Sequence, residues 1–217
     1  MKKYVIKIMR QNYTLFVLAK YLRQIMHKNG VEIKSDGTYK FHKYIKGRGN
    51  KVYIGKDSII YKSNLIISGL NNVLIIGENV RIGKNSTFRL TGNNLTIKIG
   101  NRTTTNSCIE FNAHNANIYV GDDCMFSNHV HIRTSDDHDI LDKDTNRVLN
   151  PSKDVIIGNK VWLTPESIVM KGVTVGDGAI LATRTIVTHD VAPHTIVAGI
   201  PGKCTKTNVV WSHLKTK

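Results

Sequence analysis

The feature that most constrains the fold is a strict six-residue period between residues 157 and 192. This segment divides into six consecutive hexapeptides, IGNKVW, LTPESI, VMKGVT, VGDGAI, LATRTI and VTHDVA. The first residue of each is aliphatic, and the fifth is small or β-branched. An amphipathic helix needs apolar residues three or four apart, and a simple strand needs them two apart. A period of six fits neither, and it predicts short strands joined by tight corners and wound into a parallel β-helix.

Three six-residue sides make one coil of eighteen residues, so residues eighteen apart should stack in neighbouring coils. The expected pairs are Ile157 with Val175, Leu163 with Leu181, and Val169 with Val187. Neighbouring coils should lie about 4.8 Å apart, the spacing of hydrogen-bonded strands. The inward aliphatic side chains would form the core, and the Gly, Asn and Asp residues between them suit tight corners.

The repeat continues towards the N-terminus in a looser form, marked by an aliphatic residue followed by glycine at one corner of each coil. These pairs begin at Ile54, Ile76, Ile99, Val120, Ile157 and Val175, with spacings of 22, 23, 21, 37 and 18 residues. The spacing of 37 equals one coil plus an insertion of 19, so residues 133–153 should form one long loop outside the solenoid. Long insertions in repeat proteins usually lie on the binding face.

The 217-residue chain has a formal net charge of +15, and most of this excess precedes the solenoid. Residues 1–51 contain 13 basic residues and 2 acidic ones. Such asymmetry favours a polyanionic partner, which can be an acidic polysaccharide, an anionic membrane surface or nucleic acid. The alternative is a basic segment that is merely solvated.

The pattern predicts three parts: a basic helical N-terminal segment (1–50), a β-helix domain with its long loop (51–203) and a C-terminal tail (204–217). Residues 4–28 interleave apolar and basic side chains at helical spacing. Such a helix can cap the end of the solenoid or lie on an anionic membrane face. Residues 31–50 are expected to be basic and irregular.

The three cysteines, Cys108, Cys124 and Cys204, are widely spaced, so we expect no disulfide framework and a reducing, cytoplasmic location. Cys124 takes the small fifth position of the hexapeptide VGDDCM and is expected to be buried. Arg10 and Gln11 interrupt the apolar residues near the N-terminus, so we expect no secretory signal.

Four motifs together resemble a known family. They are R-T-S-D-D-H-D-I (133–140), K-D-V-I-I-G-N-K-V-W-L (153–163), A-G-I-P-G-K (198–203) and N-V-V-W (208–211). With the hexapeptides, they are similar to the hexapeptide-repeat O-acetyltransferases, and most similar to bacterial enzymes that acetylate capsular polysialic acid and related surface glycans. The resemblance covers roughly residues 118–212 well.

This resemblance implies an all-β solenoid, a left-handed parallel β-helix, in which three copies assemble as a homotrimer with active sites between subunits. It implies transfer of an acetyl group from acetyl-CoA, the co-substrate, to a sugar hydroxyl of a bacterial surface glycan such as sialic acid-containing capsular polysaccharide. An acidic glycan is then the expected partner, and neither nucleic acid nor a metal is expected. The basic N-terminal segment could also hold the protein at the inner face of an anionic membrane.

A sugar hydroxyl is a poor nucleophile at neutral pH and needs a base that takes its proton as it attacks. His138, in the long loop and in the resembling motif, is the candidate for that general base. A nearby carboxylate would fix the imidazole tautomer, and Asp136 matches the family motif better than Asp137.

Trp162 occupies the sixth, outward position of IGNKVW, and the resemblance implies that it lies near the thioester end of CoA. The alternative is packing against a neighbouring subunit. Further candidates for cofactor binding lie near the end of the solenoid: Lys171, Arg184, Pro201, Lys203 and, more weakly, Lys206. Candidates for binding the acceptor are Arg133, Lys46 and Arg48.

Three other functions remain open at this point. An N-acetyltransferase that acts on a nucleotide-linked amino sugar would need the same base and the same donor. A γ-type zinc hydratase would need three histidines around one metal, with His114, His129 and His131 as the candidates and the last two in one strand. A non-catalytic scaffold would bind acidic polymer without turnover of acetyl-CoA.

Overall fold

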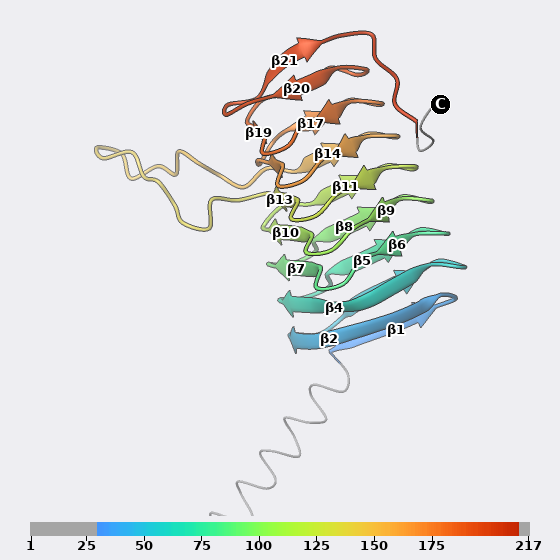
Figure 1. Cartoon of the computed structure of the whole chain (residues 1–217). Coiled ribbons are helices and arrows are strands. Elements are labelled where there is room, and N and C mark those ends of the chain that lie inside the picture. The colour runs from blue at the N-terminus through green and yellow to red at the C-terminus, as the bar shows by residue number, and fades with distance from the viewer. Residues whose placement is uncertain (1–29, 213–217) are drawn as a thin grey trace, which may run out of the picture.

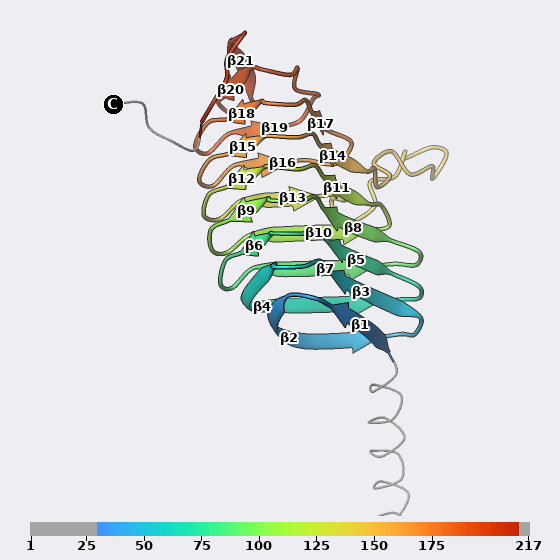
Figure 2. The same cartoon turned by 90° about the vertical axis from the view of Figure 1, so that its right-hand side faces the viewer.

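A computed structural model describes residues 30–212, in which every regular element is a β-strand. The strands wind into a triangular solenoid with three walls, and one long loop leaves it near mid-height (Figures 1 and 2). The chain passes from wall 1 to wall 3 to wall 2 in each coil. Within residues 30–212 there is no helix with the length and apolar character needed to cross a bilayer.

Except for β21, the strands of each wall pair in parallel with those of the coils above and below. Wall 1 contains β1 (Val31–Ser35), β3 (Asn50–Ile54), β5 (Val73–Ile76), β8 (Thr96–Ile99), β11 (Ile118–Val120), β14 (Val155–Ile157) and β17 (Thr174–Val175). Wall 2 contains the second halves of β2 (Thr38–Lys46) and β4 (Ile59–Ser68), then β7 (Thr87–Thr91), β10 (Glu110–His114), β13 (His131–Arg133), β16 (Ile168–Val169) and β19 (Ile186–Val187). The first residues of β2 pair with the start of β4. Wall 3 contains the start of β4, β6 (Arg81–Ile82), β9 (Thr104–Thr105), β12 (Met125–Phe126), β15 (Trp162–Leu163), β18 (Ile180–Leu181), β20 (Ile196–Ala198) and β21 (Lys203–Lys206).

The strand register confirms the predicted stacking. Ile157 pairs with Val175, Leu163 with Leu181, and Val169 with Val187. The aliphatic–glycine corners also align through the longer coils, from Ile54 through Ile76, Ile99 and Val120 to Ile157. The predicted fold class, an all-β solenoid of hexapeptide repeats, is therefore confirmed.

Side chains of different size fill the two ends of the solenoid. In the longer coils Phe88 and Phe111 lie flat against each other, with ring centroids 4.9 Å apart, and Phe126 follows at 6.2 Å from Phe111. All three rings are buried. In the eighteen-residue coils the inward positions hold only smaller residues, such as Leu181 and Val187. Longer strands enclose a wider prism, and close packing of that prism requires larger side chains.

The extra residues of the longer coils form stacked corners that explain several buried polar groups. Asn50 accepts a hydrogen bond from the backbone N–H of Asn72 (2.9 Å), and Asn72 accepts one from Leu95 (2.9 Å). Gly69 has a φ of +133°, and a Cβ at this position would lie 1.8 Å from the carbonyl oxygen of Gly92. The corner therefore requires glycine on both counts.

Three boundaries differ from the sequence prediction or lie outside the described residues. The expectation that residues 31–50 are irregular is wrong, because β1 and β2 form the first walls of the solenoid there. The lysines of β2 interrupt the apolar pattern that would indicate a strand, although Ile45 in this strand is buried. The C-terminal part is not a simple tail, because β21 pairs antiparallel with β20. The helix expected at residues 4–28 lies outside the described residues.

Candidate active site

The long loop leaves the solenoid between β13 and β14, at the edge where wall 2 meets wall 1 (Figure 1). The expectation of one insertion between residues 133 and 153 is therefore confirmed. His138 is exposed near the base of this loop and lines a cleft of about 350 Å³. The cleft is lined by polar side chains: His114, Asn115, Ser135, Asp137, His138, Asp139, Asn150 and Ser152.

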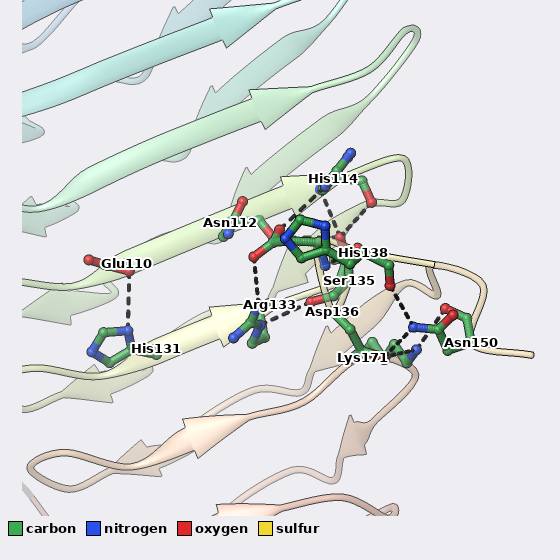
Figure 3. A network of polar contacts seen from close by, with 12 residues as sticks. Glu110, Asn112, His114, His131, Arg133, Ser135, Asp136, His138, Asn150 and Lys171 are labelled. Atoms are coloured by element: carbon green, nitrogen blue, oxygen red, sulfur yellow. Dashed lines mark hydrogen bonds and ion pairs between the residues drawn. The ribbon is translucent and has the colours of Figure 1, made fainter. Parts of the chain in front are cut away.

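Three side chains form a polar cluster at the base of the loop (Figure 3). Lys171, from the next coil, donates to Asp136 Oδ2 at 2.5 Å and to the carbonyl oxygen of Asn150 at 2.8 Å. Asn150 Nδ2 donates to Asp136 Oδ2 and to the carbonyl oxygen of His138, both at 2.9 Å. Hydrogen bonds from Lys171 and then Asn150 lower the pKa of Asp136 below its ordinary value.

Asp136 contacts groups other than the imidazole that we expect it to orient. Its carboxylate pairs with Lys171 and Asn150, and within residues 30–212 the His138 ring has no hydrogen-bond partner. The neighbouring Asp137 accepts from Arg133 Nη2 at 2.7 Å and lies 3.4 Å from His114 Nδ1. Within residues 30–212, both carboxylates therefore bond to side chains of the loop and of the solenoid, and neither bonds to the imidazole of His138.

Arg133, a candidate for acceptor binding, forms its hydrogen bonds with the first turn of the loop. Besides Asp137, it donates from Nε to the carbonyl oxygen of Ser135 at 2.9 Å. It also lines a second, smaller cleft of about 190 Å³ on wall 2. That cleft is lined by Glu110, Asn112, His131, Ile132, Arg133, Asp137 and Ile168.

Lys46 and Arg48, the other acceptor candidates, lie far from His138 along the solenoid but on the same edge. The strand register places Lys46 beside Ser68, Ser68 beside Thr91, and Thr91 beside His114. Lys46 is therefore three coils below the cleft residue His114, about 14 Å along the solenoid axis. Arg48 follows in the turn after β2.

Trp162 lies on wall 3, half-buried under the C-terminal segment. Its ring is 6.0 Å from that of Trp211, at an angle of 46°. Trp211 is buried and donates from Nε1 to the carbonyl oxygen of Lys160 at 2.6 Å. Trp162 Nε1 is buried and has no hydrogen-bond partner in the described part of the chain. The expected outward direction of the Trp162 side chain is confirmed. The sequence pattern did not predict that Trp211 covers Trp162, although the motif N-V-V-W ends on Trp211.

The basic candidates for cofactor binding do not gather at one place. Lys171 forms an ion pair with Asp136 at the base of the loop, whereas we expected it to bind a phosphate of CoA. Arg184 pairs with Glu166 at 2.7 Å across neighbouring corners, and this pair lowers the pKa of Glu166. Pro201 and Lys203 lie together, exposed, at the turn into β21. Lys206, at the other end of β21, is also exposed.

The histidines proposed for a zinc site are dispersed. His129 lies in a corner with a φ of +58°, so the expectation that it shares a strand with His131 is wrong. His131 Nδ1 lies 3.2 Å from Glu110, and His114 lies next to Asp137. Among residues 30–212, no three His, Cys, Asp or Glu side chains are placed to hold a metal ion.

Comparisons with known proteins find similarity to acetyltransferases. No family model matches the chain. It is 36% identical over 138 residues to the polysialic acid O-acetyltransferase of Escherichia coli O1:K1 / APEC, which covers 61% of this chain but only 44% of that protein. It is 31% identical over 148 residues to the polysialic acid O-acetyltransferase of Neisseria meningitidis, covering 58% of this chain and 68% of that protein.

A solved structure extends this likeness to the whole solenoid. The crystal structure of the polysialic acid O-acetyltransferase OatWY superposes with a TM-score of 0.79 at 30% sequence identity. The match covers 87% of this chain and 89% of that one.

Proposed function

Because the chain belongs to the hexapeptide-repeat O-acetyltransferases, the family that includes the polysialic acid O-acetyltransferases, we propose that it acetylates a sugar hydroxyl of an acidic surface glycan. Acetyl-CoA is the co-substrate and donor. Sialic acid-containing capsular polysaccharide is the acceptor class that the relatives favour.

In this proposal His138 is the general base. The imidazole takes the proton of the acceptor hydroxyl as its oxygen attacks the thioester carbonyl carbon. The C–S bond then breaks, and the imidazolium returns the proton to the departing CoA thiolate. The cleft of about 350 Å³ beside His138, which is lined by polar groups, supports a sugar acceptor at this place.

The observation that carries the proposal is the separation of the two principal candidate residues. The loop that carries His138 leaves the edge between walls 2 and 1, and β15, which carries Trp162, lies in wall 3 on the other side of the solenoid (Figure 2). A single chain cannot bring the two residues together. A site that contains both needs the loop of one copy against wall 3 of another, and a homotrimer closes this head-to-tail arrangement.

The loop tip supports contact with a second copy. Ile140, Leu141 and Leu149 are each at least half exposed, although they are large apolar residues. Such a group on a projecting loop is typical of an interaction surface. In the assembly we propose, this tip packs near Trp162, Pro201 and Lys203 of the neighbouring copy, and these residues bind CoA.

The edge that carries the cleft also supports an extended, acidic acceptor. The column from His114 down to Lys46 contains only serine and threonine between its ends. Lys46 and Arg48 are exposed and carry positive charge about 14 Å from the cleft. A polyanionic glycan that occupies the cleft can therefore reach them with units on either side of the reacting sugar.

The test is incubation of the purified protein with acetyl-CoA and a panel of acidic glycans, neutral glycans and nucleotide-linked amino sugars. Mass spectrometry and NMR then locate the acetyl group. The proposal predicts an ester on an acidic glycan. An amide on an amino sugar would show that the protein is an N-acetyltransferase. Binding of acidic polymer without any acetyl transfer would show that it is a non-catalytic scaffold.

A further inference from the structure

We propose that Lys171 and Asn150 are positioning residues: through Asp136 they close the base of the long loop and set the place of His138. This inference rests on the function proposed for His138. It concerns three side chains, Lys171, Asp136 and Asn150, which we call the loop clasp (Figure 3).

The clasp joins parts of the chain that are distant in sequence. Asp136 is near the start of the loop, Asn150 is near its end, and Lys171 belongs to the corner between β16 and β17 in the next coil. Lys171 bonds to both loop ends at once, to the carboxylate of Asp136 at 2.5 Å and to the carbonyl oxygen of Asn150 at 2.8 Å. One ammonium group therefore ties the two ends together and ties both to the solenoid.

The environment of the clasp makes its ion pair stronger than an ordinary surface pair. The side chains of Lys171 and Asp136 are 17% and 31% exposed, whereas those of the Arg184–Glu166 pair are 72% and 45% exposed. Exposed pairs contribute little because water screens them. A pair that is largely withdrawn from water is screened less, and removal of one partner leaves the other charge partly buried.

Asn150 links the clasp to the backbone of His138, the residue we propose as the general base. Its amide nitrogen donates to the carbonyl oxygen of His138 at 2.9 Å, and its Oδ1 accepts from the N–H of Ile140 at 2.6 Å. One side chain thus holds the backbone on both sides of Asp139. Since the His138 ring has no hydrogen-bond partner in residues 30–212, its position depends on this backbone.

Other contacts of the loop do not replace the clasp. The outer part is a hairpin closed on itself, with the Leu141–Val148 bridge and the bond from Asp142 N–H to Arg147 C=O at 2.8 Å. These bonds fix the shape of the tip but not its position on the solenoid. Asp137 anchors the start of the loop, through Arg133 and His114. The bond from Lys153 N–H to the carbonyl oxygen of Thr134 at 3.0 Å also joins the two loop ends, but it lies outside the segment from Asp136 to Asn150 that carries His138.

The experiment compares Lys171→Met, Lys171→Arg and Asn150→Ala with the matched control Lys56→Met, which removes an exposed lysine at a corner of the solenoid away from the loop. We expect Lys171→Met and Asn150→Ala to lower kcat at least about tenfold, because a displacement near 1 Å can cost about a hundredfold in rate. The KM for acetyl-CoA should stay within about twofold. Lys171→Arg should recover most of the loss, and Lys56→Met should match the wild type.

Three outcomes would overturn the inference: an unchanged kcat in Lys171→Met, a loss that appears only as a higher KM for acetyl-CoA, or a loss that Lys171→Arg does not reduce. The second outcome would make Lys171 a contact of CoA. Hydrogen exchange of residues 138–150 gives a readout that does not depend on turnover, and Lys171→Met should raise the exchange rate at Ile140. If the wild type acetylates no acceptor while exchange still responds to Lys171→Met, the clasp stands and the proposed function fails.

Discussion

His138 and Trp162 lie on opposite sides of the same solenoid, the first on a loop at the edge between walls 2 and 1 and the second on wall 3. Trp162 is already covered on one side by Trp211 of its own chain. Its Nε1 is buried without a partner in residues 30–212. Because these two residues lie so far apart, the active site that we propose is built from residues of two chains.

Substitution of His138 tests the general base. His138→Ala should reduce acetyl transfer by at least about a hundredfold, since general-base catalysis contributes about 10² to 10⁴ in rate. Binding of acetyl-CoA, measured by calorimetry, should remain within a few-fold of the wild type. His129→Asn is the matched control, because asparagine tolerates the positive φ at this corner. Turnover of His138→Ala above a tenth of the wild-type rate would exclude the assignment.

Substitution of Trp162 tests its contact with the donor. Trp162→Ala should raise the KM for acetyl-CoA or lower kcat by about tenfold or more, since an aromatic contact is lost. Trp162→Phe should retain much of the activity. The melting temperature must be measured in parallel, because Trp162 also packs on Trp211. Unchanged kinetics in a variant with a lower melting temperature would leave Trp162 only a packing role.

Neutralisation of the distant basic residues tests the acceptor path. Lys46→Gln combined with Arg48→Gln should raise the KM for an acidic polymer about three- to tenfold and should leave the KM for a short acceptor unchanged. Added salt should reduce the difference, because salt screens charges at the surface. Lys56→Gln, which removes an exposed lysine at another corner, serves as the control. An equal KM for the polymer in all three proteins would count against this path.

The cysteines test the packing of the core. Cys124 is buried, and burial raises the pKa of its thiol to about 12, so the reactive thiolate is scarce at pH 8. Cys204 is exposed in β21. A thiol reagent applied to the native protein at pH 8 should therefore label Cys204 quickly and Cys124 only after unfolding, as peptide mass spectrometry would show. Rapid labelling of Cys124 in the native protein would contradict the described core.

The fold could be predicted because a six-residue period specifies stacking partners directly. Ile157, Leu163 and Val169 each face the residue eighteen positions later. The same reasoning failed for β2, which lies in the first described coil and, within residues 30–212, pairs only with β4. A strand at the end of a solenoid covers the core from one side, so most of its positions can be polar without loss of packing.

The site was predicted in part, and the failures have a physical cause. The insertion between β13 and β14 identified the loop of His138 from spacing alone. The partner of Asp136 is Lys171, thirty-five residues later in the chain, and the partner of Trp162 is Trp211. Both contacts depend on how corners and ends stack in three dimensions, which the hexapeptide pattern does not determine for outward side chains. Proximity within one motif therefore does not predict the hydrogen-bond partners of Asp136.

The most direct test of the shared site mixes two impaired proteins. His138→Ala and Trp162→Ala are refolded or coexpressed together in equal amounts, and acetyl transfer is compared with that of each variant alone. If one copy supplies His138 and its neighbour supplies Trp162, random assembly leaves both residues intact at about one quarter of the sites, and about one quarter of the wild-type rate should return. A mixture whose rate does not exceed the mean of its two components, although mass spectrometry shows mixed oligomers, would contradict a site built between chains.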